Sequence, residues 1–169
     1  RGATRQQILD QMTAAQSKLL KEVWDRRTDN LPVKTPEELV ILASIVEKET
    51  ARADERPRVA GVFVNRLNKG MPLQSDPTIV YGLYGGDAWT QDRSAITRAD
   101  LDKKTPYNTY QIPALPPGPI GNPGRAAMEA VANPSRTKDL YFVADGTGGH
   151  VFAETYEQHQ RNVAKWRKV

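Results

Sequence analysis

Two glutamates in the first third of the chain, Glu47 and Glu49, are suited to acid–base chemistry. They end the segment 36–49, in which apolar residues recur at helical spacing. At about 100° per residue, Glu49 falls on the apolar arc of this helix, whereas Glu47 falls almost opposite. The arc is formed by Ile41, Leu42, Ile45 and Val46. Because apolar neighbours remove water from a carboxyl group and raise its pKa, the pattern predicts that Glu49 is a proton donor.

A less specific interpretation of Glu49 remains open from the pattern alone. The stem of a helical glutamate can pack on apolar neighbours while its carboxylate reaches Arg52 or water. Glu47 is predicted to make a polar contact or to lie at the edge of a cleft. Separate substitutions of the two acids would distinguish their roles.

Amide and phenol side chains elsewhere could bind a hydroxyl-rich ligand, which suggests a sugar. The candidates are Asn65, Gln74, Tyr107, Asn108 and Tyr110. Asp76 precedes a proline and is expected to cap a helix rather than act as a second catalytic acid. His150 is expected to be a strand residue that is hydrogen-bonded to a neighbour, and the aromatic residues at 141, 142 and 152 are expected in the core.

Several other kinds of chemistry are not favoured. The 169 residues include no cysteine and two histidines, so thiolate metal sites are excluded and a histidine-rich metal site is not expected. No nucleophile elbow or phosphate-binding loop is present, and we expect no cofactor. The net charge of +4 is mild and no nucleic-acid-binding motif accompanies it. No apolar run approaches the roughly 20 residues that span a bilayer.

The helix that carries the two acids has a well-marked start. Thr35 can cap its first turn, and Pro36 suits the first helical position, where no backbone donor is needed. An amphipathic helix over about 5–28 comes before it, and we expect the two helices to pack as an antiparallel pair.

A proline-rich segment, 112–124, cannot be a helix or a central strand, because it contains five prolines and three glycines. We expect an ordered loop anchored by Leu115 and Ile120. The runs 140–144 and 150–153 flank a glycine-rich turn and predict a β-hairpin. The predicted fold is therefore α+β, a mainly helical single domain with a small antiparallel hairpin.

Six motifs, spread in order over most of the chain, resemble those of the YceG-like family, the membrane-anchored endolytic murein transglycosylases. They lie at 43–50 (ASIVEKET), 62–67 (VFVNRL), 73–78 (LQSDPT), 107–110 (YNTY), 115–120 (LPPGPI), and 141–146 (YFVADG) with 149–152 (GHVF). The resemblance implies a catalytic domain over 35–169, preceded by an N-terminal helix and connector over 1–34.

The resemblance also implies an activity. Family members cleave peptidoglycan glycan strands between N-acetylmuramic acid and N-acetylglucosamine without water and leave a 1,6-anhydro end. Their catalytic glutamate matches Glu49, the acid that the helical pattern also selects. The residues that the motifs suggest for glycan binding are Glu47, Asn65, Gln74, Asp76, Tyr107, Asn108, Tyr110 and Gly118.

The family context further implies a location and partners. The full-length protein is expected to have a single-pass anchor in the cytoplasmic (inner) membrane, to face the periplasm and to work beside peptidoglycan synthases. Three other functions stay open, namely a noncatalytic glycan-binding module, a glycan hydrolase, and a basic surface that docks on synthases or anionic lipid.

Overall fold

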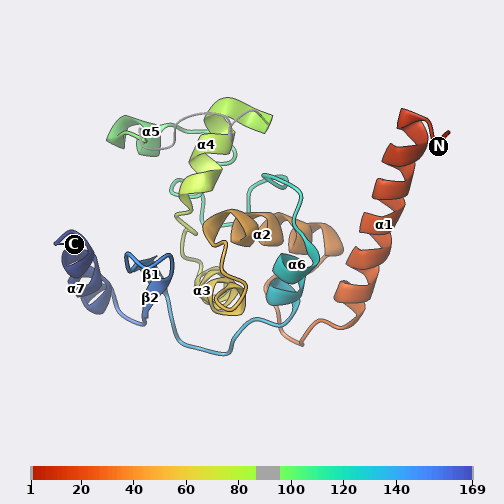
Figure 1. The fold of residues 1–169 in the computed structure, drawn as a ribbon. Coiled ribbons are helices and arrows are strands. Elements are labelled where there is room, and N and C mark those ends of the chain that lie inside the picture. Colours follow the sequence, from red (N-terminus) through yellow and green to blue (C-terminus); the bar gives the residue numbers. More distant parts are fainter. Residues whose placement is uncertain (1, 87–95, 169) are drawn as a thin grey trace.

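The computed structural model describes residues 2–86 and 96–168, which form seven helices and one two-stranded antiparallel sheet (Figure 1). The elements in order are α1 (Arg5–Asp25), α2 (Pro36–Glu49), α3 (Arg56–Asn68), α4 (Asp76–Tyr84), α5 (Arg98–Asp102), α6 (Arg125–Ala132), β1 (Tyr141–Ala144), β2 (His150–Ala153) and α7 (Tyr156–Trp166). The predicted α+β class, mainly helical with a small hairpin, is confirmed.

Helix α2 is the centre of the hydrophobic core. Its residues 41–46 are all buried, and it packs against α3 and α6. Thr35 caps it as predicted, since the Thr35 hydroxyl accepts a hydrogen bond from the Glu38 N–H at 3.2 Å, and Pro36 occupies the first helical position. The carboxyl end of α2 faces the side of the molecule that carries the hairpin and α7 (Figure 1).

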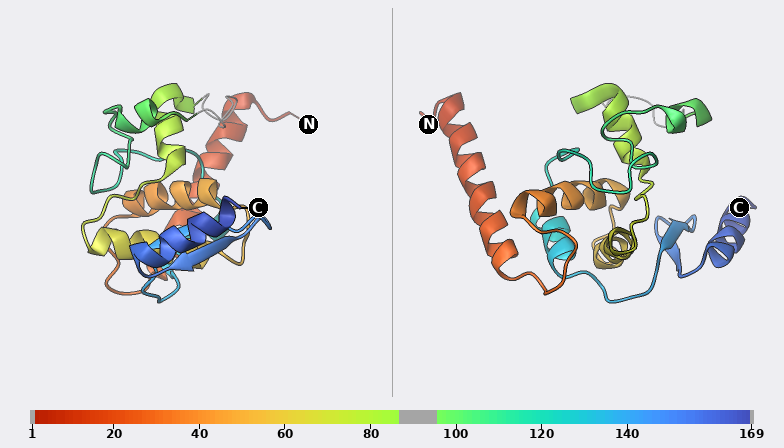
Figure 2. Two further views of the ribbon diagram at one scale, coloured as in Figure 1. Left: turned by 90° about the vertical axis from the view of Figure 1, so that its left-hand side faces the viewer. Right: turned by 180° about the vertical axis from the view of Figure 1, so that it is seen from behind.

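Helix α1 forms where it was predicted, but its packing differs from the expectation. In Figures 1 and 2 it crosses α2 at a steep angle instead of running antiparallel to it. Only the last part of α1 contributes to the core, through Val23, while Ile8, Leu9 and Met12 near its start are exposed. The connector is held by a hydrogen bond from the Thr28 N–H to the Ala132 carbonyl at 2.9 Å. The apolar spacing therefore predicted the helix but not its direction.

The proline-rich segment is an ordered loop, as predicted. Ile120 is fully buried in the core, and its N–H donates to the Ser44 hydroxyl of α2 at 3.0 Å. Four residues later the Gly124 N–H donates to Oε1 of Glu47, at 3.2 Å. Two backbone donors of the loop are thus satisfied by side chains of α2, which ties the loop along that helix.

The hairpin pairs Phe142 with Phe152, and its turn contains glycines with positive φ, at Gly146 and Gly148. That backbone conformation favours glycine. The ring of Phe142 meets that of Phe63 edge to face at 5.8 Å between centroids, which joins the hairpin to α3. Helix α7 then packs on the outer side of the hairpin.

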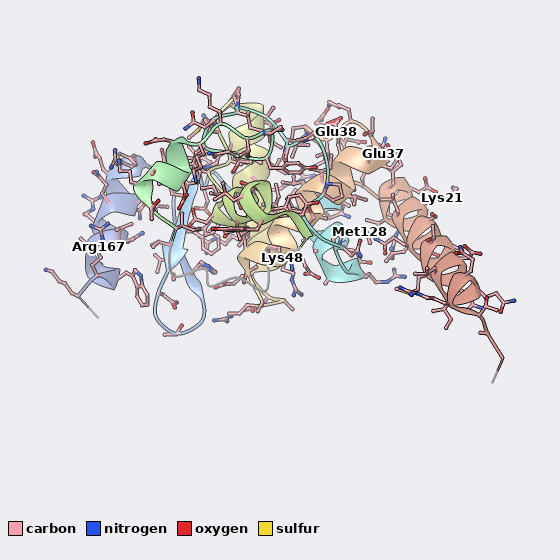
Figure 3. The ribbon with its side chains drawn as sticks, turned by 90° about the horizontal axis from the view of Figure 1, so that it is seen from above. Lys21, Glu37, Glu38, Lys48, Met128 and Arg167 are labelled. Carbon is pink, nitrogen blue, oxygen red and sulfur yellow. The ribbon has the colours of Figure 1, made fainter. Side chains whose placement is uncertain are left out.

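The overall arrangement is elongated. Figure 3 shows Lys21 on α1 toward one end and Arg167, just after α7, toward the other, with Lys48 of α2 between them. No helix of the described ranges is both long and apolar enough to cross a bilayer.

Candidate active site

A cavity of about 310 Å³ opens where the carboxyl end of α2 meets α3, the start of α4, the hairpin and α7. Its polar lining comes from these elements, from Gln74 shortly before α4 and from Tyr110 in the loop after α5. The polar and aromatic lining residues are Glu49, Arg66, Gln74, Asp76, Tyr110, Tyr141, His150, Tyr156 and His159. Four of the residues selected from the sequence, Glu49, Gln74, Asp76 and Tyr110, are therefore brought together here.

Glu49 is the last residue of α2, and its carboxyl group has an unusually high pKa. Burial is the main cause and raises this pKa from 4.5 to about 7, with a further upward contribution from the charge of Asp76. A hydrogen bond from the Ser75 hydroxyl and the charge of His150 act in the opposite direction. At neutral pH a large fraction of the molecules thus carry a proton on Glu49.

A buried network of hydroxyl groups holds Ser75 against Glu49. The Ser75 hydroxyl donates to Oε1 of Glu49 at 2.6 Å, while its N–H donates to the Thr109 hydroxyl at 2.9 Å. Thr78 donates to the Ser75 carbonyl at 2.6 Å and lies 2.8 Å from the Thr109 hydroxyl. Because one oxygen of Glu49 is occupied by Ser75, the other is available to hold the proton.

Asp76 is not the helix cap that the sequence suggested. It is the first residue of α4 and makes no capping hydrogen bond with its side chain. Its Oδ1 instead accepts a hydrogen bond from the Tyr110 hydroxyl at 2.6 Å. Burial, and next this hydrogen bond, raise the pKa of Tyr110 above its usual range. Asp76 is thus a second carboxylate in the cavity that contains Glu49.

Arg66 lines the cavity, although no functional role was predicted for it. Its Nε donates to the Leu140 carbonyl and its Nη1 to the Pro72 carbonyl, both at 2.7 Å, and its guanidinium lies 5.0 Å from the centre of the Tyr141 ring. The spacing of Arg66 from Val62 and Phe63 places it on the inner face of α3. From the sequence, this spacing could have predicted that Arg66 is a buried cation.

Aromatic residues from the hairpin and α7 complete the wall. Tyr141 stacks on His159, with ring centroids 5.0 Å apart and an angle of 21° between the planes. Tyr141 was assigned to the core, but it lines the cavity, as do His150, Tyr156 and His159. His150 does make the predicted hydrogen bond to a neighbour, Glu55.

Two of the sequence candidates, Glu47 and Asn65, lie outside the lining of this cavity. Oε2 of Glu47 lies 3.5 Å from Nη2 of Arg56, and its other oxygen holds the proline-rich loop. Asn65 donates to the Thr137 and Asp139 carbonyls, both at 2.9 Å. These contacts hold the proline-rich loop and the segment that leads to the hairpin, so neither side chain belongs to the cavity.

Three more candidates, Tyr107, Asn108 and Gly118, also lie outside the lining. Asn108 is buried and donates to the Leu101 and Lys103 carbonyls at 3.0 and 2.7 Å. Tyr107 packs edge to face on another tyrosine, and a Cβ added at Gly118 would lie 2.9 Å from the Tyr107 hydroxyl. The motif 107–110 therefore supplies Tyr110 to the cavity, while Thr109 supports Ser75, Tyr107 packs on α4 and Asn108 holds the end of α5.

The described ranges contain no group of three or more His, Cys, Asp or Glu side chains arranged to hold a metal ion. The side chains of the cavity offer a chemistry of their own. It combines a carboxyl group that is partly protonated at neutral pH, a second carboxylate, a fixed cation and several aromatic faces. Such a set can transfer a proton to a polar ligand and can bind sugar rings and hydroxyl groups.

Comparisons with known proteins agree with this arrangement. The model of the YceG-like family matches residues 1–165. The endolytic murein transglycosylase of Streptococcus pneumoniae strain D39 is 41% identical over 166 residues, which is 96% of this chain and 29% of that protein. The endolytic murein transglycosylase of Bacillus subtilis strain 168 is 39% identical over 128 residues, 76% of this chain and 34% of that protein.

A solved structure shows the same fold. The crystal structure of a yceG-like protein from Listeria monocytogenes superposes with a TM-score of 0.80 at 36% sequence identity, and the match covers 94% of this chain and 50% of that one. The chain spans about a third of the length of the curated relatives that it matches. By the family model and by these identities, the chain belongs to the YceG-like family.

Proposed function

We propose that this domain cleaves the glycan strands of peptidoglycan as an endolytic lytic transglycosylase, with Glu49 as the single catalytic acid and base. The observation that carries the proposal is the raised pKa of Glu49, about 7, in a cavity with polar and aromatic walls. Membership of the YceG-like family and the names of the curated relatives, endolytic murein transglycosylase, support the substrate and the reaction.

The reaction proceeds in two proton transfers. Protonated Glu49 donates its proton to the glycosidic oxygen between N-acetylmuramic acid and N-acetylglucosamine as the bond from that oxygen to C1 breaks. The C6 hydroxyl oxygen of the same muramic acid then bonds to C1, and the Glu49 carboxylate takes the hydroxyl proton. Glu49 is protonated again at the end, no water is consumed, and the new end is a 1,6-anhydro sugar.

A pKa near 7 suits both steps, because the same group must give and then accept a proton at neutral pH. General acid–base assistance of this kind is worth about 10² to 10⁴ in rate. Closure by the substrate's own hydroxyl gains further from proximity, since the nucleophile is held beside the carbon that it attacks. The second carboxylate that most glycosidases require is unnecessary here.

The glycan-binding residues that we propose are those that line the cavity. Gln74, Asp76 and Tyr110 come from the sequence candidates, and the structure adds Arg66 and Tyr141. Asp76 and Tyr110 offer an acceptor and an aromatic face side by side. Tyr141, fixed by its stack on α7, offers a face on which a sugar ring can lie.

The location of the substrate suggests where the domain works. Peptidoglycan lies outside the cytoplasmic membrane, so we place the domain on the extracytoplasmic side. We further propose that an anchor in the cytoplasmic membrane tethers the full-length protein beside peptidoglycan synthases.

The test is digestion of purified glycan strands followed by mass spectrometry of the new ends. We expect products lighter by one water than those of a hydrolase. Glu49→Gln should reduce the product by about 10² or more, because it keeps the shape of the side chain and removes its acidic proton. The matched variant Glu47→Gln, two residues away on the same helix, should remain active. Wild-type product formation by a folded Glu49→Gln protein would reject the assignment.

A glycan hydrolase is the second candidate function, because Asp76 puts a second carboxylate in the cavity. A hydrolase would use Asp76 to activate water or to attack C1, and its products would contain the added water. Under that mechanism Asp76→Asn would abolish cleavage. Under transglycosylation the Asp76→Asn products should still be 1,6-anhydro sugars, with weaker glycan binding and a shifted pH dependence.

A further inference from the structure

His150 is clamped by Glu55 at the edge of the cavity. It begins β2, and its ring nitrogen Nδ1 lies 2.8 Å from Oε2 of Glu55. The backbone N–H of His150 also donates to Glu55, reaching Oε1 at 2.9 Å. Both side chains are largely buried, with 15% of His150 and 13% of Glu55 exposed. The Phe142 ring meets the imidazole edge to face at 5.3 Å and fixes its plane.

This contact determines what the other ring nitrogen can do. An ionised carboxylate only accepts hydrogen bonds, so Nδ1 of His150 must carry a proton toward Glu55. In the neutral imidazole Nε2 is then an acceptor. Among the residues that the structure describes, none forms a hydrogen bond with this Nε2, and His150 lines the same cavity as Glu49.

When its ring is charged, His150 lowers the pKa of Glu49, and when the ring is neutral it supplies an acceptor to the cavity. The cavity already holds the carboxylates of Glu49 and Asp76, and the charge of Asp76 raises the pKa of Glu49. A third carboxylate would raise it further and would favour permanent protonation. An imidazole nitrogen can accept a hydrogen bond from a sugar hydroxyl without adding negative charge.

We propose that His150 is a further substrate-binding residue, whose Nε2 accepts a hydrogen bond from a hydroxyl group of the glycan, and that Glu55 is a positioning residue that fixes its tautomer. The proposal rests on the proposed glycan substrate. It assigns to the hairpin a direct part in holding the strand for Glu49, beyond its contribution to packing.

The first test observes the two histidines of the chain directly. Long-range ¹H–¹⁵N spectra of the Glu49→Gln protein contain two imidazole systems, and a His159→Gln variant identifies His150. At alkaline pH we expect His150 as the Nδ1–H tautomer. Uncrosslinked oligosaccharides of alternating N-acetylglucosamine and N-acetylmuramic acid should shift its Nε2 signal. The Nε2–H tautomer, or an unchanged Nε2 signal on saturation with glycan, would overturn the proposal.

The second test changes the tautomer without touching the substrate. In Glu55→Gln, the backbone N–H of His150 requires an acceptor, so the amide oxygen must face it and the NH₂ group must face Nδ1. The neutral ring is then forced into the Nε2–H tautomer, which cannot accept a hydrogen bond from a hydroxyl. We expect the KM for glycan strands to rise by about 5–10-fold with a smaller change in kcat.

Asp54→Asn is the matched control, because Asp54 lies next to Glu55 and forms an exposed ion pair with Arg52. In Asp54→Asn, the His150 tautomer and the KM for glycan strands should equal those of the wild type. A reversed tautomer in Glu55→Gln with an unchanged KM would overturn the proposal while leaving the proposed function intact. If the wild type cleaves no glycan and binds none, the proposed function itself fails, even though the predicted tautomer can still be observed.

Discussion

Glu49→Gln should stabilise the protein as well as inactivate it, by an amount that depends on pH. Folding moves the pKa of Glu49 from 4.5 to about 7, so between these values the folded state binds a proton that the unfolded state lacks. The wild type therefore loses stability as pH rises through this window. The full shift corresponds to about 3 kcal/mol. Because Glu49 is partly open to the cavity, solvent screening should leave about 1–2 kcal/mol.

Urea unfolding of the wild type and Glu49→Gln at several pH values measures this difference. The two proteins should have similar stability near pH 4, and the variant should become the more stable as pH rises to 7, with no further gain above. Glu37→Gln is the control, since Glu37 is an exposed acid on the same helix and should show no such gain. A difference between wild type and Glu49→Gln that is constant from pH 4 to 8 would refute the burial of an ionisable group at this site.

Three further predictions follow from contacts around Glu49 and in the 107–110 loop. Ser75→Ala removes the hydrogen bond that lowers the pKa of Glu49, so the alkaline limb of the pH–rate profile should move to higher pH. Asp76→Asn removes a charge that raises this pKa and should move the alkaline limb to lower pH. A shift of the alkaline limb in the same direction in both variants would contradict the assignment. Asn108→Ala removes the side-chain donor of the Lys103 carbonyl and one of two side-chain donors of the Leu101 carbonyl, which keeps Gln111, and should cost about 1–3 kcal/mol of unfolding free energy in urea, with activity per folded molecule retained.

The position of Glu49 could be predicted from the sequence because it depends on one helix. The spacing of Ile41, Ile45 and Glu49 fixes which side of α2 the acid occupies, and Thr35 fixes where the helix starts. That the proline-rich loop is ordered could also be predicted, because it contains the apolar Ile120, which is buried in the core. In both cases the determining contacts are local or involve strongly apolar residues.

The hairpin wall of the cavity could not be predicted in the same way. His150 meets Glu55 across 95 positions of sequence, and Tyr141 reaches the cavity through its stack on α7 and its contact with Arg66. A short apolar strand gives no sign of which face lines a cavity. Only the packing of the hairpin against α3 determines it.

The amides Asn65 and Asn108 were predicted to bind glycan, but they form hydrogen bonds to the backbone instead. A polar side chain in a motif can bind a ligand or can satisfy the backbone of its own fold, and the two uses look alike in a sequence. Both amides donate to two backbone carbonyls each, those of Thr137 and Asp139 in an irregular segment and those of Leu101 and Lys103 at the end of α5, where carbonyls lack a partner within the helix. The predicted antiparallel packing of α1 on α2 was wrong, because the spacing of apolar residues shows which face of a helix is buried but not the angle at which two helices cross.

The most direct test of the account is the titration of the Glu49 carboxyl group by ¹³C NMR, with Glu49→Gln to assign its signal. The account predicts a midpoint near pH 7, because the group is buried beside Asp76 and only partly compensated by Ser75. A midpoint near 4.5, the ordinary value for a glutamate, would contradict it, since Glu49 would then be ionised at neutral pH and could not supply the proton that glycan cleavage requires.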